Sequence, residues 1–248
     1  MPELAPWGWV LLASAVIVVG ISKAALPGAN LVPVAIFASI LPARTSTATL
    51  LVLLLVGDIL AMVMYRRHAD WPLLIRLAPA VLLGMIVGGF FLAFADDAGV
   101  RKVIGGILLV MVALTFWLRR RPVRVGGGRH GSRVQSIGYG SLGGFTTMVA
   151  NAGGPVMSLY FLALRIDVKA FLGTAAWFFA IVNVAKIPVA FTLGLFTMPG
   201  LIVDAVLVPA VVIGALVGRK IAARMNQAVF DRLIFGLTIV AALYLLFR

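Results

Sequence analysis

Long hydrophobic runs, separated by short polar or glycine-rich segments, extend along this chain from end to end. A helix needs about 20 apolar residues to cross a bilayer. Five runs clearly reach that length: Ser46–Tyr65, Trp71–Ala95, Ala170–Leu193, Gly200–Gly218 and Val229–Phe247. Ile104–Leu118 is shorter, and we predict that it crosses as well. Apolar residues do not alternate with polar ones, as they do in the strands of an outer-membrane barrel, so the spans are predicted to be helices.

Two further apolar stretches are interrupted by glycine, asparagine and proline. Each consists of a longer arm, a break and a short piece, which are Trp7–Ile21, Lys23–Asn30 and Leu31–Leu41 in the first stretch and Ile137–Val149, Ala150–Gly154 and Pro155–Leu164 in the second. Helices as short as the last piece reach only about half way through a bilayer. We therefore predict two hairpins whose tips lie at membrane depth. Full crossing by both arms is the alternative, and it leaves the same connectivity.

The chain consists of two similar halves. Asp58 and Asn183 are 125 residues apart, as are Arg44 and Lys169. Four more residues recur at a spacing of 130 residues. They are Pro79, Gly84, Gly88 and Gly106, and they correspond to Pro209, Gly214, Gly218 and Gly236. We predict a first membrane repeat over 1–118, a linker over 119–136 and a second membrane repeat over 137–248. The predicted fold is an all-α polytopic membrane protein, with one broken hairpin and three transmembrane helices per repeat.

Composition and charge support a membrane protein. Of the 248 residues, 62% are hydrophobic and 12% are charged, whereas soluble domains carry about 25% charged residues. The formal net charge is +13, and one cluster of basic residues crowds the glycine-rich linker: Arg119, Arg120, Arg121, Arg124, Arg129 and Arg133. Such clusters bind nucleic acids in other proteins. Between two hydrophobic halves, the cluster is better explained by the bias of basic residues toward cytoplasmic loops, so we predict a cytoplasmic linker and no nucleic-acid partner.

The basic residues also predict the orientation of the spans. With the linker inside, Arg66–His68, Lys169 and Lys220 fall on the cytoplasmic side, and the loop with Asp96 falls outside. The exceptions are Arg44 and the Arg101–Lys102 pair. Both termini are predicted to lie outside. The two halves then have opposite orientations, which makes the chain an inverted repeat.

The two breaks are the predicted anion-binding region. Helix starts carry free N–H groups that attract anions, and glycine allows a ligand to approach the backbone. Asn30 is predicted to cap the short helix of the first hairpin, and Asn151 or Gly153 to lead into that of the second. The alternative is that the glycines and prolines merely kink the helices. The predicted binding residues in the breaks are Lys23, Gly28, Asn30, Asn151, Gly153 and Gly154.

Polar residues within the spans complete the predicted site, because a charge there costs about 3 kcal/mol and needs a partner or a role. Asn183 and Lys186 share one helix face at a spacing of three residues, and Asp58 lies in the matching helix of the first half. One hypothesis is a structural Asp58–Lys186 ion pair. The other is that Asp58 carries protons as a coupling residue while Lys186 neutralises an anionic substrate. Lys23 is predicted either to bind the anion or to extend to the lipid headgroups.

Signatures of enzymes and of metal sites are missing from the sequence. There is no cysteine, which excludes disulfides and thiolate metal sites. No Ser/His/Asp arrangement, phosphate-binding loop or metal-ligand spacing occurs, and Glu3 is the single glutamate, which argues against a carboxylate-pair enzyme. We therefore expect neither an enzyme nor a cofactor or metal.

The paired breaks, Asn183-x-x-Lys186 and the repeated Pro-x4-Gly-x3-Gly resemble the sulfite exporter TauE/SafE family over essentially the whole chain. This resemblance implies a multi-pass transporter of the bacterial inner membrane that exports sulfite or small organosulfonates. The first break departs from the family's glycine-rich run, because Ala24, Ala25 and Ala29 surround Gly28. We predict a secondary transporter that works by alternating access and holds the anion between the two hairpin tips, near the bilayer midplane.

Other functions fit parts of the pattern. The substrate of such a transporter can instead be another small anion, such as a carboxylate, and a channel is a further alternative. A non-transporting membrane subunit or assembly factor would explain the hydrophobicity and the basic loop, but not two matched broken segments. The expected partners are a small anionic substrate and the lipid bilayer, with proton coupling and a homodimer left open.

Overall fold

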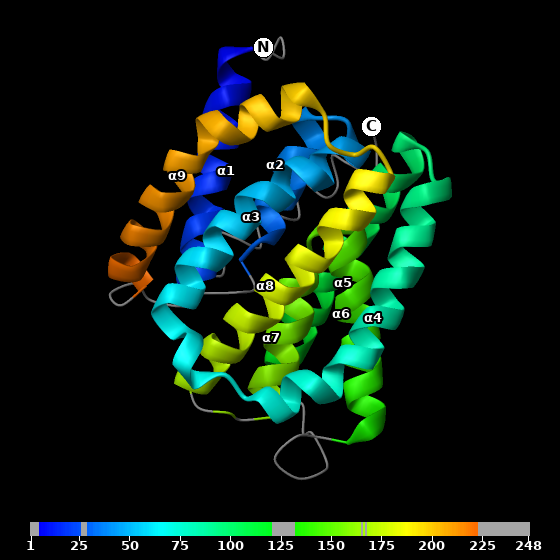
Figure 1. Cartoon of the computed structure of the whole chain (residues 1–248), viewed down its shortest axis with the longest axis vertical. Helices are drawn as coiled ribbons and strands as arrows, with labels where there is room; N and C mark the ends of the chain where they lie inside the picture. The colour runs from blue at the N-terminus through cyan, green and yellow to red at the C-terminus, as the bar shows by residue number, and fades with distance from the viewer. Residues whose placement is uncertain (1–4, 26–28, 121–131, 165, 167, 223–248) are drawn as a thin grey trace.

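The structure is a computed structural model of the chain, and it describes residues 5–25, 29–120, 132–164, 166 and 168–222. All regular structure in these ranges is helical, which confirms the predicted all-α fold class. The elements shown in Figure 1 are α1 (Pro6–Ala25), α2 (Leu31–Ile40), α3 (Ala43–Tyr65), the short 3₁₀ helix η1 (Arg66–His68), α4 (Trp71–Phe94), α5 (Asp97–Arg120), α6 (Arg133–Ala150), α7 (Gly153–Ala163), α8 (Val168–Thr192) and α9 (Met198–Ala222).

Five of the described helices are long and apolar enough to cross a membrane, which confirms a polytopic membrane protein. They are α1, α3 together with η1, α4, α8 and α9. The helix α5 starts at Asp97, earlier than the predicted Ile104, and carries Arg101 and Lys102 in its first turns. Its crossing of the membrane stays a prediction. The predicted span Val229–Phe247 lies outside the described residues.

Both interrupted stretches form a helix pair with a break, at the predicted places. The pairs are α1 with α2 and α6 with α7. The helix α6 begins before the predicted Ile137, because Ser132 and Gln135 form a reciprocal capping box at its start. In Figure 1, α2 lies in the upper half of the molecule and α6 and α7 lie in the lower half.

The break after α6 has a defined backbone conformation. Asn151 has a φ of 53°, in the left-handed region, which asparagine tolerates better than most residues. Its N–H donates to the carbonyl of Thr147 at 3.0 Å, and the N–H of Ala152 donates to the carbonyl of Thr146 at 3.1 Å. These bonds satisfy the last carbonyls of α6, and α7 starts two residues after Asn151.

Close helix contacts match between the two halves. The helix α1 packs against α9, and α6 packs against α4. Each contact joins the long first helix of one hairpin to the second of the long helices that follow the other hairpin. Gly20 and Gly214 in the first contact, and Gly84 and Gly144 in the second, lie against the backbone of the partner helix, where a Cβ would collide. The opposite orientation of the halves in a membrane stays a prediction.

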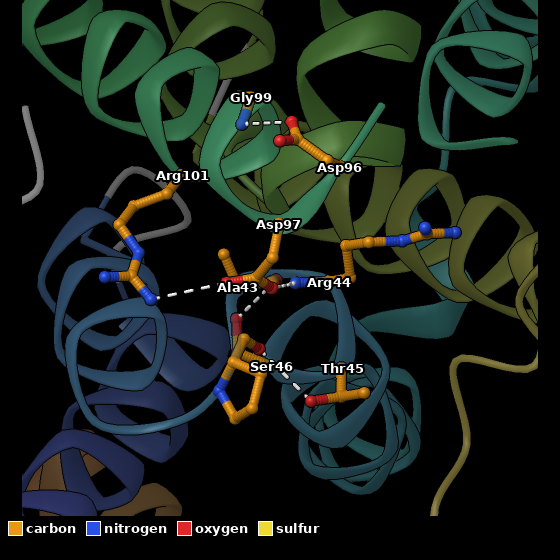
Figure 2. A network of polar contacts seen from close by, with 9 residues as sticks. Ala43, Arg44, Thr45, Ser46, Asp96, Asp97, Gly99 and Arg101 are labelled. Atoms are coloured by element: carbon orange, nitrogen blue, oxygen red, sulfur yellow. Dashed lines mark hydrogen bonds and ion pairs between the residues drawn. The ribbon is translucent and has the colours of Figure 1, made fainter. Parts of the chain in front are cut away.

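Figure 2 shows how the starts of α3 and α5 are joined. The side chain of Asp97 accepts a hydrogen bond from the backbone N–H of Arg44 at 3.0 Å and another from the guanidinium of Arg101 at 3.3 Å. Asp96 accepts from the N–H of Gly99 at 2.8 Å and so caps the first turn of α5. The predicted loop with Asp96 is therefore the start of α5, and Asp97 bonds this start to α3.

Candidate functional site

A continuous set of hydrogen bonds joins the two hairpin breaks through the middle of α3 and α8. Lys23, at the end of α1, donates to Asp58 Oδ1 in α3. Asp58 Oδ2 accepts from Asn183 Nδ2 in α8 at 2.6 Å. Lys186, also in α8, donates to Asn183 Oδ1 at 3.3 Å and to Asn151 Oδ1. We call these five residues the polar chain, and each of them is 7% exposed or less.

The first hairpin contributes Lys23 through a gap in the surface of α3. A Cβ on Gly57 would lie only 2.8 Å from the Cγ of Lys23, so the glycine leaves room for the lysine stem beside Asp58. The Nζ of Lys23 also lies 4.8 Å from the ring centroid of Phe179 in α8, within the range of a cation–π interaction. These contacts hold the ammonium group in the protein interior and show that the predicted extension of Lys23 to the lipid headgroups is wrong.

The second hairpin contributes Asn151, whose position is fixed from two sides. Its left-handed backbone conformation ends α6. Its Nδ2 donates to the carbonyl of Thr47 in α3 at 2.8 Å, which leaves Oδ1 to accept from Lys186. The break of the second hairpin is thus bonded both to α3 and to α8.

The predicted Asp58–Lys186 ion pair is wrong, because Asp58 pairs with Lys23. The helix α1 packs against α3. This contact brings Lys23, near the break of the first hairpin, to Asp58 in α3. Within the described part of the chain, Lys186 has no carboxylate within 4.0 Å, and its two partners are neutral amide oxygens. With both lysines charged, the polar chain carries two positive groups and one negative group.

A small cavity lies beside the first break. Its polar lining consists of Lys23, Asn30 and Asp58, and the remaining lining residues are Ala61, Leu172, Ala175, Ala176 and Phe179. Its water-accessible volume is about 10 Å³, which is enough for about one water molecule. In this conformation, the cavity is therefore too small for an oxyanion.

Asn30 occupies the predicted position but not the predicted role. It is the residue before α2, yet its side chain makes no capping bond. Its Oδ1 is instead buried beside the cavity and has no hydrogen-bond partner in the described part of the chain. A buried acceptor without a partner costs about 1–3 kcal/mol, so this oxygen is available to a guest that can donate a hydrogen bond.

The glycines of the breaks are less informative than the polar residues. Gly153 and Gly154 begin α7 and are buried next to Asn151. No hydrogen bond of the described residues has either backbone N–H as its donor, as expected at a helix start. A Cβ on Gly153 would meet the Cβ of Thr147 at 2.8 Å, so close helix packing also requires glycine there. Gly28 lies outside the described residues.

Of the nine residues predicted for binding or coupling, the structure connects Lys23, Asp58, Asn151, Asn183 and Lys186 directly. Sequence reasoning missed Gly57 and Phe179, and it did not foresee that the backbone carbonyl of Thr47 would accept a hydrogen bond from Asn151. It also missed the pairing of Asp58 with Lys23, although the sequence holds a signal for it. Lys23 and Asp58 are 35 residues apart, and Asn151 and Lys186 are separated by the same 35 residues.

Comparison with known proteins agrees with the resemblance of the motifs. The sequence model of the family described as Sulfite exporter TauE/SafE matches residues 12–245. This range includes the whole polar chain, the second hairpin and all of the first hairpin except the first residues of α1. No curated protein and no solved structure matches the chain. Because the family match extends over nearly the whole sequence, the chain belongs to the sulfite exporter TauE/SafE family.

Proposed function

We propose that the protein is a secondary transporter that exports a small sulfur oxyanion, either sulfite or a small organosulfonate, across the bacterial inner membrane. The family match supports an exporter of this kind. The structural observation that carries the proposal is the excess of basic over acidic side chains in the polar chain, where Lys23 and Lys186 face a single carboxylate, that of Asp58. A small anion bound there would supply the negative charge that a buried, protonated Lys186 lacks among the described residues.

Lys186 is the group that most needs an anion. A buried charge is expensive unless it is paired, and in this conformation Lys186 has only the amide oxygens of Asn151 and Asn183. An oxyanion that replaces the Asn151 oxygen would convert a hydrogen bond to a neutral group into a charge-assisted bond between two ions, which is stronger. The start of α7, directly after Asn151, adds backbone N–H groups that favour the same ligand.

Lys23 and Asn30 extend the proposed site toward the first hairpin. Asp58 already neutralises Lys23, so this lysine contributes less to the net attraction. Its role would be to hold the first break against α3, while the amide of Asn30 offers both a donor and an acceptor to the ligand. The anion would then lie between the two hairpin tips, in contact with Lys186 on one side.

The proposed mechanism is alternating access. The cavity in the described conformation takes about one water molecule, so an oxyanion enters only after the hairpin tips move away from α3 and α8. The bonds from Asn151 to Thr47 and from Lys186 to Asn151 would open on one side of the membrane at a time. Asp58 would remain a candidate coupling residue in this cycle.

Flux of labelled sulfite into proteoliposomes tests the proposal. The wild-type protein should take up sulfite faster than empty liposomes, and unlabelled sulfite inside should accelerate uptake by exchange, which a channel does not show. Lys186→Ala should lose most of this flux, whereas Lys220→Ala, a matched change of an exposed lysine at the end of α9, should retain it. No flux of sulfite or of a sulfonate by the folded wild-type protein would overturn the proposed function.

A further inference from the structure

A second buried carboxyl group lies apart from the polar chain. Asp204, in the first half of α9, is 2% exposed. Neither of its carboxylate oxygens has a hydrogen-bond partner among the residues that the structure describes. The residues of α9 next to it and one turn on, Val203 and Leu207, are buried aliphatic side chains. Asp204 thus combines full burial in a membrane-spanning helix with two unsatisfied oxygens.

None of the described helices that pack against α9 supplies a counter-charge. The helices α1 and α3 pack against α9, and their titratable residues in the described ranges are Lys23, Arg44, Asp58 and Tyr65. None of them is within ion-pair or hydrogen-bond distance of Asp204. Lys23 and Asp58 bond to each other, and the hydroxyl of Tyr65 donates to the carbonyl of Ala24 at 2.9 Å.

Helix packing at this place does not require a carboxyl group. The residue 130 positions earlier is Leu74, which the repeat in the sequence makes the counterpart of Asp204. Leu74 is buried in α4, the helix that packs against α6 in the same way that α9 packs against α1. One half of the molecule therefore fills this position with an aliphatic side chain, while the other half places an acid there.

An ionised carboxylate without a partner in an apolar interior costs several kcal/mol, and the group takes up a proton instead. We propose that Asp204 is a proton-binding site that couples anion transport to the proton gradient, an inference that rests on the proposed transport function. In the closed conformation the carboxylate has accepted one proton from the aqueous phase and is a neutral carboxylic acid. It returns that proton to water when α9 moves and its oxygens become hydrated.

The first test needs no transport. Infrared spectra of the purified full chain, in sodium-free buffer at neutral pH, should show the C=O band of a protonated carboxylic acid. The band should be lost in Asp204→Asn and retained in Asp58→Asn, the matched change of the other buried acid in the described spans. A wild-type spectrum without the band, or a band that persists in Asp204→Asn, would overturn the proposal. Loss of the band on adding Na⁺ at constant pH would also overturn it, because Asp204 would then be a cation site.

The second test measures coupling. A pH gradient should accelerate uptake of labelled sulfite by the wild-type protein in proteoliposomes. Asp204→Asn should keep sulfite exchange at equal pH on both sides and lose the acceleration, and Asp204→Glu should keep both. Retained acceleration in Asp204→Asn would contradict the proposal. If the variant with asparagine does not fold, Asp204→Leu, which copies Leu74, replaces it.

The two tests separate failure of this proposal from failure of the proposed function. If the wild-type protein transports no anion, the proposed function fails while the infrared band still reports whether Asp204 holds a proton. If the wild-type protein transports sulfite and the acceleration survives in Asp204→Asn, the transport function stands and the assignment of Asp204 fails.

Discussion

Lys186 donates a hydrogen bond to Asn151 across an interval of 35 residues, the same interval that separates Asp58 from its partner Lys23. In both halves, a residue at the hairpin break bonds to the middle of the following long helix. The chemistry differs, because the first half pairs a lysine with a carboxylate and the second pairs an amide with a lysine. This difference leaves Lys186, beside the second hairpin, without a carboxylate partner among the described residues.

We expect Lys186→Ala to weaken sulfite binding about tenfold to hundredfold, because a hydrogen bond to a charged group contributes about 1.5–3 kcal/mol. Lys186→Arg should recover part of this affinity, since it keeps the charge but presents a planar group. Binding can be measured by ligand-induced thermal stabilisation of the purified protein, with Lys220→Ala as the control. Equal affinity in wild type and Lys186→Ala would remove Lys186 from the site.

Breaking the Lys23–Asp58 ion pair should destabilise the protein more than removing both partners. Asp58→Asn keeps the contact with Asn183 but leaves Lys23 as an unpaired buried charge, and such a change costs about 3–5 kcal/mol. The double variant Lys23→Met/Asp58→Asn removes that charge and should regain most of the loss in thermal unfolding experiments. If the loss of stability in the double variant equals the sum of the losses in Lys23→Met and Asp58→Asn, the pair does not act as a unit.

The sequence predicted the helices and the two hairpins well, because hydrophobic runs and breaks are local features. The four predicted spans Ser46–Tyr65, Trp71–Ala95, Ala170–Leu193 and Gly200–Gly218 correspond closely to α3, α4, α8 and α9. Boundaries were less accurate where side-chain caps decide them. The start of α6 is one example, because the bonds between Ser132 and Gln135 add a turn that hydropathy does not show.

Partners within the site were harder to predict, because they depend on which helices pack together. Periodicity places Asn183 and Lys186 on one helix face, and the structure agrees. It does not show that α1 packs against α3, which brings Lys23 rather than Lys186 to Asp58. Asp204 lies within the predicted span Gly200–Gly218, so sequence reasoning missed a visible signal there, and the packing of α9 against α1 and α3 adds that its carboxylate lacks a partner among the described residues.

The close contact of α4 with α6 depends on glycine at its centre. A Cβ on Gly144 would lie 2.9 Å from the carbonyl carbon of Val81, and backbone atoms cannot move aside as a side chain can. Gly144→Ala should therefore lower stability by about 1–3 kcal/mol, the range for overpacked sites. Gly138→Ala is the matched control in the same helix, because no atom lies within 4 Å of its added Cβ. Similar thermal midpoints for the two variants would contradict this account of the contact.

Raising the pH should destabilise the wild-type protein through Asp204. In our proposal, Asp204 is a neutral carboxylic acid in the folded protein, whereas the same group in an unfolded chain is ionised at neutral pH, so alkaline conditions favour unfolding. The contribution of Asp204 to stability should be fully present at acidic pH and should be lost as the pH rises. Asp204→Asn cannot ionise and should show a smaller decline in thermal midpoint over the same range. Parallel curves for the two proteins would indicate that Asp204 is ionised, or hydrated, in the folded state.

The absence of cysteine makes the predicted topology directly testable. A single cysteine at Ser132, the cap of α6, should be labelled by a membrane-impermeant maleimide only after the inner membrane is opened, because the basic linker before it is predicted to be cytoplasmic. A cysteine at Thr197, between α8 and α9, should be labelled in cells with a permeable outer membrane and an intact inner membrane, since this segment is predicted to face outward. Sulfite export from such cells confirms that each variant is folded. Reversal of the two labelling patterns would invert the orientation, and labelling of both sites from outside would rule out the predicted number of crossings between them.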